Sequence, residues 1–327
     1  MSRPLVLTHQ SSYLHNAPNH PERPERIAAI ETAIARDEAL GGLRRMQVEL
    51  PEEAPVPGAA AARVAAASVH DERLVEMIFE VGAEANAMGA GGWIDADTYI
   101  GPGSLEAACG ALISGREAAA RVLAGDAATA FSFCRPPGHH ATRRQAMGFC
   151  FFNNVAVAAQ SAVDLGLDRV AIVDFDVHHG NGTQDIFYDR SDVLYVSTHQ
   201  WPLYPGTGSI DERGAGRGEG FTVNLPLPAG TGDDEYTRVF DDMVIPVLDS
   251  FEPQLLLVSA GFDAHGADPL AGMEVTTAGF VALARRLLDA ADRLCDGRSA
   301  WMLEGGYDLE ALGDSAAAIV AEAARGG

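Results

Sequence analysis

The chain is poor in cysteine pairs, in basic residues and in long apolar runs, and each shortage argues against a class of protein. Its four cysteines, Cys109, Cys134, Cys150 and Cys295, lie far apart with no C-x-x-C pair, so disulfides and thiolate metal sites are disfavoured. No apolar run is long enough to span a bilayer. The first residues do not resemble a signal peptide, and we therefore expect a cytoplasmic protein without a membrane partner.

Basic residues are outnumbered by acidic ones, because the chain has 23 Lys and Arg against 46 Asp and Glu, a formal net charge of −23 at pH 7. A surface of this charge repels nucleic acid and attracts cations, so we expect no nucleic-acid partner. Lysine-rich tails and polyamines are compatible substrates, although the same charge could serve solubility alone. Hydrophobic residues make up 47% of the 327 residues and charged residues 21%, which is typical of a globular protein.

Short apolar runs alternate along the chain with alanine-rich stretches that have helical periodicity. The expected strands cover residues 1–9, 130–133, 169–175, 193–197, 255–259 and 301–303. The expected helices cover residues 105–123, 154–165, 233–248 and 277–294, and Gly/Pro-rich loops cover 51–58, 89–103, 202–220 and 226–232. This alternation predicts one α/β domain over residues 1–327, with a mainly parallel sheet covered on both faces.

Polar residues follow four of the expected strands, at the ends where open α/β sheets form their ligand sites. These residues are His139, His140, Asp174, Asp176, His178, Asn181, Asp263 and Tyr307, and most lie near glycines. Packing of a hydrophobic core does not readily explain ionisable and hydrogen-bonding side chains at the ends of four strands. We therefore expect the strand ends to form one functional cleft.

Asp176 and His178 are two residues apart, and residues at this spacing on a strand point to the same face. With Asp263 as a third ligand, they predict a catalytic zinc site with an open position. Iron(II), cobalt and manganese also suit one imidazole and two carboxylates. An isolated D-x-H sequence is more often a surface or capping cluster, so the prediction depends on the other strand ends.

The adjacent histidines His139 and His140 are candidates for general acid–base catalysis, because imidazole titrates near neutral pH. Asp174 and Asn181 are candidate partners that orient the two rings. Tyr307 follows two glycines and could donate a hydrogen bond to a developing oxyanion, although a tyrosine of the core is the alternative.

Six segments resemble, in their order, the signature blocks of the histone deacetylases. They are residues 137–140, 148–150, 174–183, 206–208, 261–263 and 304–307. Residues 15–26 resemble the N-terminal block of the family, and the resemblance extends from about residue 5 to about residue 318. Asn181, where class I members carry aspartate, is similar to class II and to the bacterial acetylpolyamine amidohydrolases.

The resemblance implies an arginase-like fold, a single domain with a central parallel sheet of about eight strands flanked by helices. It implies one Zn²⁺ ion held by Asp176, His178 and Asp263. It makes His140 the proton-transfer residue, His139 its electrostatic partner and Tyr307 the donor that polarises the substrate carbonyl, with Asp174 and Asn181 beside the histidines. The implied reaction is hydrolysis of an acetyl-lysine amide in a protein or peptide, which releases acetate.

The resemblance also implies a narrow tunnel for the acyl-lysine side chain, walled by Phe149 and Tyr204. The Gly148 carbonyl would accept a hydrogen bond from the substrate N–H group, and Arg26 would line a channel for acetate. Hydroxamate-type inhibitors are expected to bind. Two structural K⁺ ions are implied, one at Asp174, Asp176, His178, Ser197 and Thr198, and one at Phe187, Arg190, Val193 and Phe221.

Two departures from the family pattern carry information. Gly101 stands where class I members often have a cysteine, so Cys150 lacks that redox partner. Leu270 follows Asp268-Pro269, where polyamine-specific members have a glutamate, and this favours acetyl-lysine over an acetylpolyamine.

Three alternatives remain open at this point. The first is an acetylpolyamine amidohydrolase. The second is an arginase-type ureohydrolase with two manganese ions, but Gly180 and His265 stand where its second metal needs carboxylates. The third is an inactive module that binds acyl-lysine, which would be expected to have lost a metal ligand or Tyr307.

Overall fold

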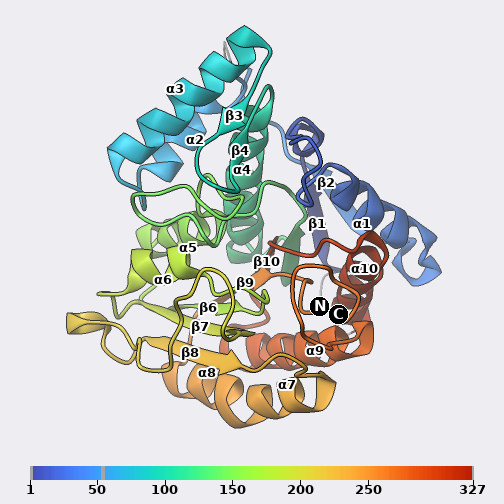
Figure 1. Cartoon of the computed structure of the whole chain (residues 1–327). Coiled ribbons are helices and arrows are strands. Elements are labelled where there is room, and N and C mark those ends of the chain that lie inside the picture. The colour runs from blue at the N-terminus through green and yellow to red at the C-terminus, as the bar shows by residue number, and fades with distance from the viewer. Residues whose placement is uncertain (1–2, 53–55, 326–327) are drawn as a thin grey trace.

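An eight-stranded sheet forms the centre of the protein, and helices pack on both of its faces (Figure 1). The structure is a computed structural model that describes residues 3–52 and 56–325. The strand order is β2-β1-β5-β10-β9-β6-β7-β8, and every neighbouring pair is parallel. The predicted single α/β domain with a parallel sheet of about eight strands is confirmed. Residues 1–2 and 326–327 of the expected domain, and residues 53–55 of the expected loop 51–58, lie outside the described residues.

The strands of this sheet are β1 (Leu5–Thr8), β2 (Arg44–Gln47), β5 (Thr129–Ser132), β6 (Val170–Asp174), β7 (Val193–Gln200), β8 (Thr222–Leu227), β9 (Leu255–Ala260) and β10 (Ser299–Leu303). All residues of β5, β6, β7, β9 and β10 are buried. Strands that are covered on both faces are apolar without alternation, which is why these five could be predicted. The two edge strands, β2 and β8, were not predicted. The expected loop 226–232 was wrong in its first two residues, because β8 extends to Leu227 and includes Pro226, which an edge strand tolerates.

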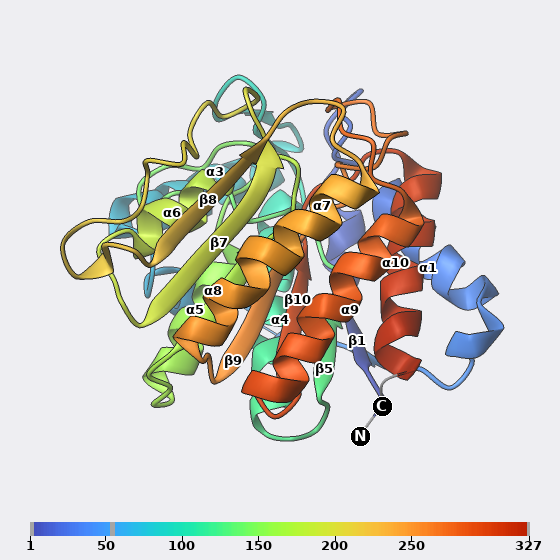
Figure 2. The same cartoon turned by 90° about the horizontal axis from the view of Figure 1, so that it is seen from below.

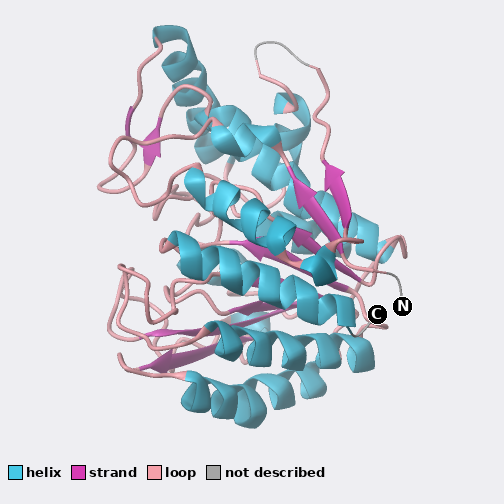
Figure 3. Ribbon diagram, turned by 90° about the vertical axis from the view of Figure 1, so that its right-hand side faces the viewer, coloured by secondary structure: helices cyan, strands magenta, loops and turns pink. Residues whose placement is uncertain are grey.

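The helices are α1 (Glu25–Arg36), α2 (Ala59–Ala66), α3 (Glu72–Met88), α4 (Ser104–Leu123), α5 (Asn154–Asp164), α6 (Asn181–Phe187), α7 (Asp233–Val239), α8 (Ile245–Phe251), α9 (Thr277–Leu294) and α10 (Leu309–Arg325). Helices α2 to α6 pack on one face of the sheet, and α1 with α7 to α10 pack on the other (Figures 2 and 3). The expected helix 233–248 is instead α7, a π-helical turn over Phe240–Val244, and α8. The expected loop 89–103 contains a short hairpin, β3 (Gly92–Trp93) and β4 (Tyr99–Ile100).

The sheet order explains why distant parts of the sequence can form one site. Strands β5, β10, β9 and β6 are consecutive neighbours in the sheet, so the loops at their carboxyl ends lie side by side. These loops carry the polar residues singled out from the sequence. Among the described residues, no helix combines the length and apolar character needed to cross a membrane.

Candidate active site

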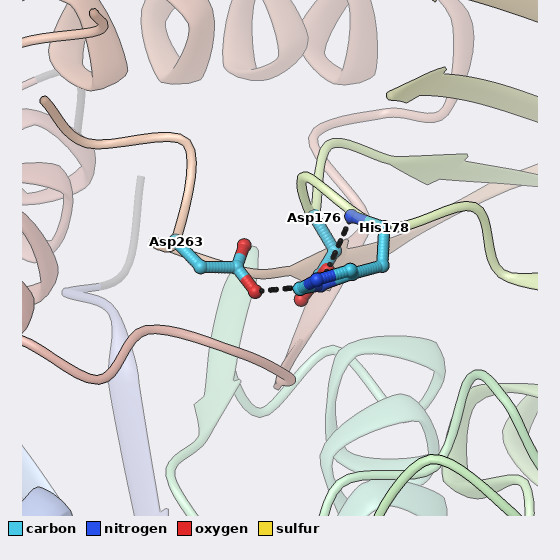
Figure 4. A group of neighbouring side chains, drawn as sticks. All are labelled: Asp176, His178 and Asp263. Carbon is cyan, nitrogen blue, oxygen red and sulfur yellow. Dashed lines mark hydrogen bonds and ion pairs between the residues drawn. The ribbon is translucent and has the colours of Figure 1, made fainter. Parts of the chain in front are cut away.

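Asp176, His178 and Asp263 form a compact group at the carboxyl ends of β6 and β9 (Figure 4). The His178 Nδ1 atom lies 3.3 Å from Oδ1 of Asp176 and 3.1 Å from Oδ2 of Asp263. Zinc–ligand distances of about 2.0–2.1 Å in a tetrahedral shell separate two donor atoms by about 3.3 Å. The two separations from His178 are close to this value, and the three donor atoms all lie within 4.8 Å of one another, so the group can hold a metal ion.

The electrostatics of this group favour a cation. Burial alone would lower the pKa of His178, but the hydrogen bonds and negative charges of Asp176 and Asp263 outweigh burial and raise the pKa to about 10. A proton on His178 and a divalent ion would thus satisfy the same two carboxylates. Metal binding displaces that proton, so the group is suited to a metal that competes well for imidazole.

Backbone amides fix the orientation of both carboxylates. The amide of Gly305 donates to Oδ2 of Asp176 at 2.7 Å, and the amide of Val177 donates to Oδ1 of Asp263 at 2.9 Å. A Cβ atom at Gly305 would lie only 2.0 Å from Oδ2 of Asp263, and a Cβ atom at Gly261 only 2.1 Å from Oδ2 of Asp176. Only glycine permits the chain to approach the carboxylates this closely.

The residues converge for a different reason from the one expected. Strand β6 ends at Asp174, so Asp176 and His178 lie in the loop that follows the strand. The strand periodicity that we used to place them on one face was therefore wrong. Their common direction comes from the loop, in which the amide of His178 donates to Oδ1 of Asp176 at 2.9 Å.

His139 and His140 lie beside this group, with ring centroids 4.0 Å apart. The His139 Nδ1 atom lies 3.0 Å from Oδ2 of Asp174, and the His140 Nδ1 atom lies 2.8 Å from Oδ1 of Asn181. The expected pairing of each histidine with its own partner is thus present, and one partner is charged while the other is neutral.

The two histidines have opposite electrostatic environments. Burial lowers the pKa of both rings, but the charges of Asp174, Asp176 and Glu304 raise the pKa of His139 well above its usual value. For His140, burial and the neighbouring cationic rings of His139 and His178 leave the pKa well below its usual value. The surroundings therefore favour the protonated form of His139 and the neutral form of His140.

Tyr307 follows β10 and points its ring into the same region, against Phe149 with ring centroids 5.9 Å apart. Its side chain is buried, and burial raises the pKa of the hydroxyl well above its usual value, so the hydroxyl keeps its proton and can donate it in a hydrogen bond. The Arg26 guanidinium lies 4.8 Å from the centre of the Tyr307 ring and donates to the carbonyl of Gly306 at 2.6 Å.

A cavity of about 230 Å³ opens above these groups. Its lining residues are Asp97, Pro137, His139, His140, Gly148, Phe149, His178, Leu203, Tyr204, Leu270, Gly305 and Tyr307. The residues expected to bind substrate, Gly148, Phe149, Tyr204 and Leu270, thus lie around one cavity. The Gly148 carbonyl accepts a hydrogen bond from the Cys150 thiol at 3.2 Å, and a carbonyl has a second lone pair for another donor.

Apart from His178, the residues expected to hold potassium do not line this cavity. Asp174, Ser197 and Thr198 are fully buried, and the Thr198 hydroxyl has no hydrogen-bond partner among the described residues. In the second expected group, the carbonyl of Phe187 accepts from the amide of Arg190 at 3.0 Å. Val193 is the first residue of β7, and Phe221 directly precedes β8.

Four residues outside the predicted catalytic, metal and substrate-binding sets also contact this site. Tyr195 donates its hydroxyl to Oδ2 of Asp174 at 3.2 Å, and Glu304 accepts from the amides of Gly138 and His139. The other two are Asp97, which lines the cavity, and Asp268, which accepts from the backbone of Tyr307. Glu304 directly follows β10, and Asp97 is an acidic residue of an expected loop that could supply a charge at the rim, so both positions were usable signals. The local sequence did not indicate the contacts of Tyr195 and Asp268.

Comparisons with known proteins agree on one family. The model of the histone deacetylase domain matches residues 20–323. A probable deacetylase of Archaeoglobus fulgidus is 40% identical over 93% of this chain and 81% of that protein. The histone deacetylase-like amidohydrolase of Pseudomonas aeruginosa is 47% identical over 66% of this chain and 58% of that protein. The crystal structure of the HDA15 HD domain superimposes with a TM-score of 0.87 at 36% identity, over 98% of this chain and 87% of that one.

Proposed function

Because the chain belongs to the histone deacetylase family, we propose that it is a zinc-dependent hydrolase of N-acetylated amines, with acetyl-lysine in proteins or peptides as the preferred substrate. One observation carries the proposal, which is that a metal-ligand group, a neutral histidine and a buried tyrosine hydroxyl meet at one cavity. The products are acetate and the free amine. The cytoplasm stays the predicted place of the reaction.

Zinc would be held by Asp176, His178 and Asp263, a set of residue types that zinc binds and whose donor atoms lie within 4.8 Å of one another. When bound there, zinc supplies Lewis-acid polarisation of the acetyl carbonyl and a water of lowered pKa. The described residues contain no second group of three such ligands, and Gly180 and His265 offer no carboxylates for one. This favours a deacetylase over a ureohydrolase with two metal ions.

His140 is the proposed general base and general acid. Its Nδ1 atom faces the amide oxygen of Asn181, which only accepts, so Nδ1 carries the proton and Nε2 is the free basic atom. Nε2 takes a proton from the attacking water and then returns it to the amine nitrogen as the C–N bond breaks. The charged ring of His139, paired with Asp174, stabilises negative charge nearby and keeps His140 neutral before the reaction.

Tyr307 is the proposed donor to the carbonyl oxygen, which becomes an oxyanion when water adds to the acetyl carbon. The hydroxyl is a preorganised donor because its ring is held between Phe149 and Arg26. Phe149 and Tyr204 would enclose the uncharged four-carbon stem of acetyl-lysine, with the substrate N–H group facing the Gly148 carbonyl.

An acetylpolyamine substrate is the second candidate, and Asp97 is the observation that favours it. Asp97 lines the cavity, and its pKa is raised by burial and by the charge of Asp95, so a substrate ammonium group would relieve its repulsion. Glu212, another acidic loop residue, does not line this cavity. Its carboxylate accepts from the amides of Gly208 and Ser209.

Potassium is proposed as a structural ion near the zinc site. Asp174 and Ser197 are paired across the neighbouring strands β6 and β7 and both are fully buried, which supports a cation at this position. The second group, at Phe187, Arg190, Val193 and Phe221, is proposed on the family resemblance alone.

We expect one catalytic divalent ion per chain, and we expect chelation of this ion to abolish turnover. Both expectations follow from a single group of three ligands. Metal analysis of active protein, followed by chelation and re-addition of zinc, measures the ratio and the recovery. Removal of the ion should also lower the melting temperature, because a ligand that binds only the folded state stabilises it. Two catalytic ions per active chain would instead support a ureohydrolase.

Acetyl-lysine peptides are expected to have a higher kcat/KM than acetylspermidine, because Leu270 gives the cavity an apolar wall where a distal ammonium has no fixed partner. Leu270→Glu should shift the ratio toward acetylspermidine by about tenfold, the effect of roughly 1.4 kcal/mol of selective binding. The measurement is a side-by-side assay of zinc-loaded protein with an acetyl-lysine peptide, longer acyl-lysine peptides, acetylputrescine and acetylspermidine.

Asp97→Asn is the matched control for this assay, because it removes the acidic side chain that already lines the cavity. If the wild-type enzyme prefers acetylspermidine and only Asp97→Asn changes that preference, Asp97 recognises the substrate and the argument from Leu270 is wrong.

All 23 basic residues of the chain are arginines, so the enzyme has no lysine of its own to compete with the peptide as a substrate.

A further inference from the structure

The Asp268 carboxylate binds the backbone of two separate segments beside the cavity. Its Oδ2 atom accepts hydrogen bonds from the amide of Tyr307 at 2.6 Å and from the amide of Asp308 at 3.2 Å. Its Oδ1 atom accepts a hydrogen bond from the amide of Leu270 at 3.0 Å. One carboxylate thus joins the tyrosine segment to the loop that supplies an apolar wall of the cavity.

The segment that carries Tyr307 needs contacts that fix its backbone, because the two residues before Tyr307 are glycines, which have few conformational restrictions of their own. Tyr307 follows Gly305 and Gly306, and Gly306 has a φ of +115°, a conformation that glycine adopts readily. On the far side, the Asp308 side chain accepts from the amide of Ala311 at 2.9 Å, at the start of α10. The amide of Gly305 and the carbonyl of Gly306 are bound by Asp176 and Arg26. Asp268 binds the next two amides, those of Tyr307 and Asp308, between this glycine pair and the helix.

Asp268 is an unusual residue for a purely structural contact. It is 7% exposed, and within the described part of the chain its side-chain partners are backbone amides, with no cationic group paired to it. Burial and the nearby charge of Asp263 raise its pKa to about 6. A neutral side chain could fill this space without placing another carboxylate near the acidic metal ligands. We infer that the carboxylate is present for the three backbone hydrogen bonds that it accepts.

We propose that Asp268 is a positioning residue that fixes the Tyr307 hydroxyl for catalysis and joins it to the Leu270 segment of the substrate cavity. The inference rests on the proposed function, because it assigns Asp268 a role through the hydroxyl of Tyr307. Asp268 does not line the cavity, so it acts on the reaction through the backbone of Tyr307.

The test is a double-mutant cycle measured as kcat and KM on an acetyl-lysine peptide with zinc-loaded protein. Asp268→Asn should lower kcat by about tenfold or more, because misplacement of a catalytic group by a fraction of an ångström is costly, and KM should change less than kcat. In the Tyr307→Phe background, where no hydroxyl remains to be positioned, Asp268→Asn should change kcat by less than about twofold.

Asp233→Asn is the matched control. Asp233 also accepts a backbone hydrogen bond from another segment, that of the Thr276 amide at 2.8 Å, but it does not line the cavity or contact Tyr307. This variant should retain the wild-type kcat. Melting temperature and zinc content are measured for every variant, so that a loss of fold or metal is not mistaken for a loss of positioning.

Different results would overturn the positioning role of Asp268 and the proposed function. If the wild-type enzyme is active and Asp268→Asn costs the same factor with and without the Tyr307 hydroxyl, the positioning role is wrong. If Asp268→Asn does not fold, Asp268→Glu, which keeps the charge and displaces the carboxylate by one methylene, should give the same non-additive pattern. If neither variant folds, Asp268 is required for the fold and the inference is overturned. A wild-type enzyme that turns over no acylated amine would overturn the proposed function itself.

Discussion

Tyr307→Phe is expected to lower kcat by roughly a hundredfold or more, because loss of one oxyanion donor typically costs about 3–4 kcal/mol in the transition state. The substitution removes only the hydroxyl. The ring contacts with Phe149 and Arg26 can persist, so the fold and the cavity should not change. The measurement is steady-state kinetics on an acetyl-lysine peptide at matched zinc occupancy.

The zinc content is the control for this variant. It should stay close to the wild-type value, because Tyr307 is not among the three residues that form the metal-ligand group. Tyr236→Phe offers a matched substitution, since Tyr236 is another buried tyrosine but does not line the cavity. A near-normal rate for Tyr307→Phe would mean that Tyr307 is a tyrosine of the core.

The sequence predicted the buried part of the sheet well and its edges poorly, for a physical reason. Strands such as β6 and β9 are covered on both faces and are therefore continuously apolar, which is a strong signal over a short run. The edge strand β2 has the sequence RRMQ and is largely exposed, so neither its composition nor its periodicity distinguishes it from a loop. Its pairing with β1 depends on contacts with a distant segment.

The residues of the candidate site also divide into those that the sequence reveals and those that it does not. Metal-ligating and acid–base residue types next to glycines at strand ends could be recognised from the sequence, since side chains of this kind have few other uses there. The backbone contacts of the supporting residues could not be recognised. Asp268 and Glu304 accept from backbone amides that lie 39 and 166 residues away, respectively. Every residue except proline has a backbone amide N–H, so the sequence does not show which one a carboxylate binds.

His140→Ala is expected to lower kcat by about 10²- to 10⁴-fold, the usual contribution of a positioned general base, with zinc content and hydroxamate binding retained. His139→Ala should be less severe, because Nε2 of His140 remains available as the base. Single-turnover rates and zinc analysis of both variants, side by side, test this order. If both variants lose zinc, the two histidines are metal ligands and not acid–base groups.

The different partners of the two histidines are the reason for this order. His139 faces the carboxylate of Asp174, which holds a proton on its ring, whereas His140 faces the neutral amide of Asn181, which does not. Asn181→Asp would place a second carboxylate at Nδ1 of His140 and raise the pKa of that ring. A base with a raised pKa stays protonated to a higher pH, so the acidic limb of the kcat/KM profile should move to higher pH in this variant. An unchanged acidic limb would show that His140 is not the group whose deprotonation activates the enzyme.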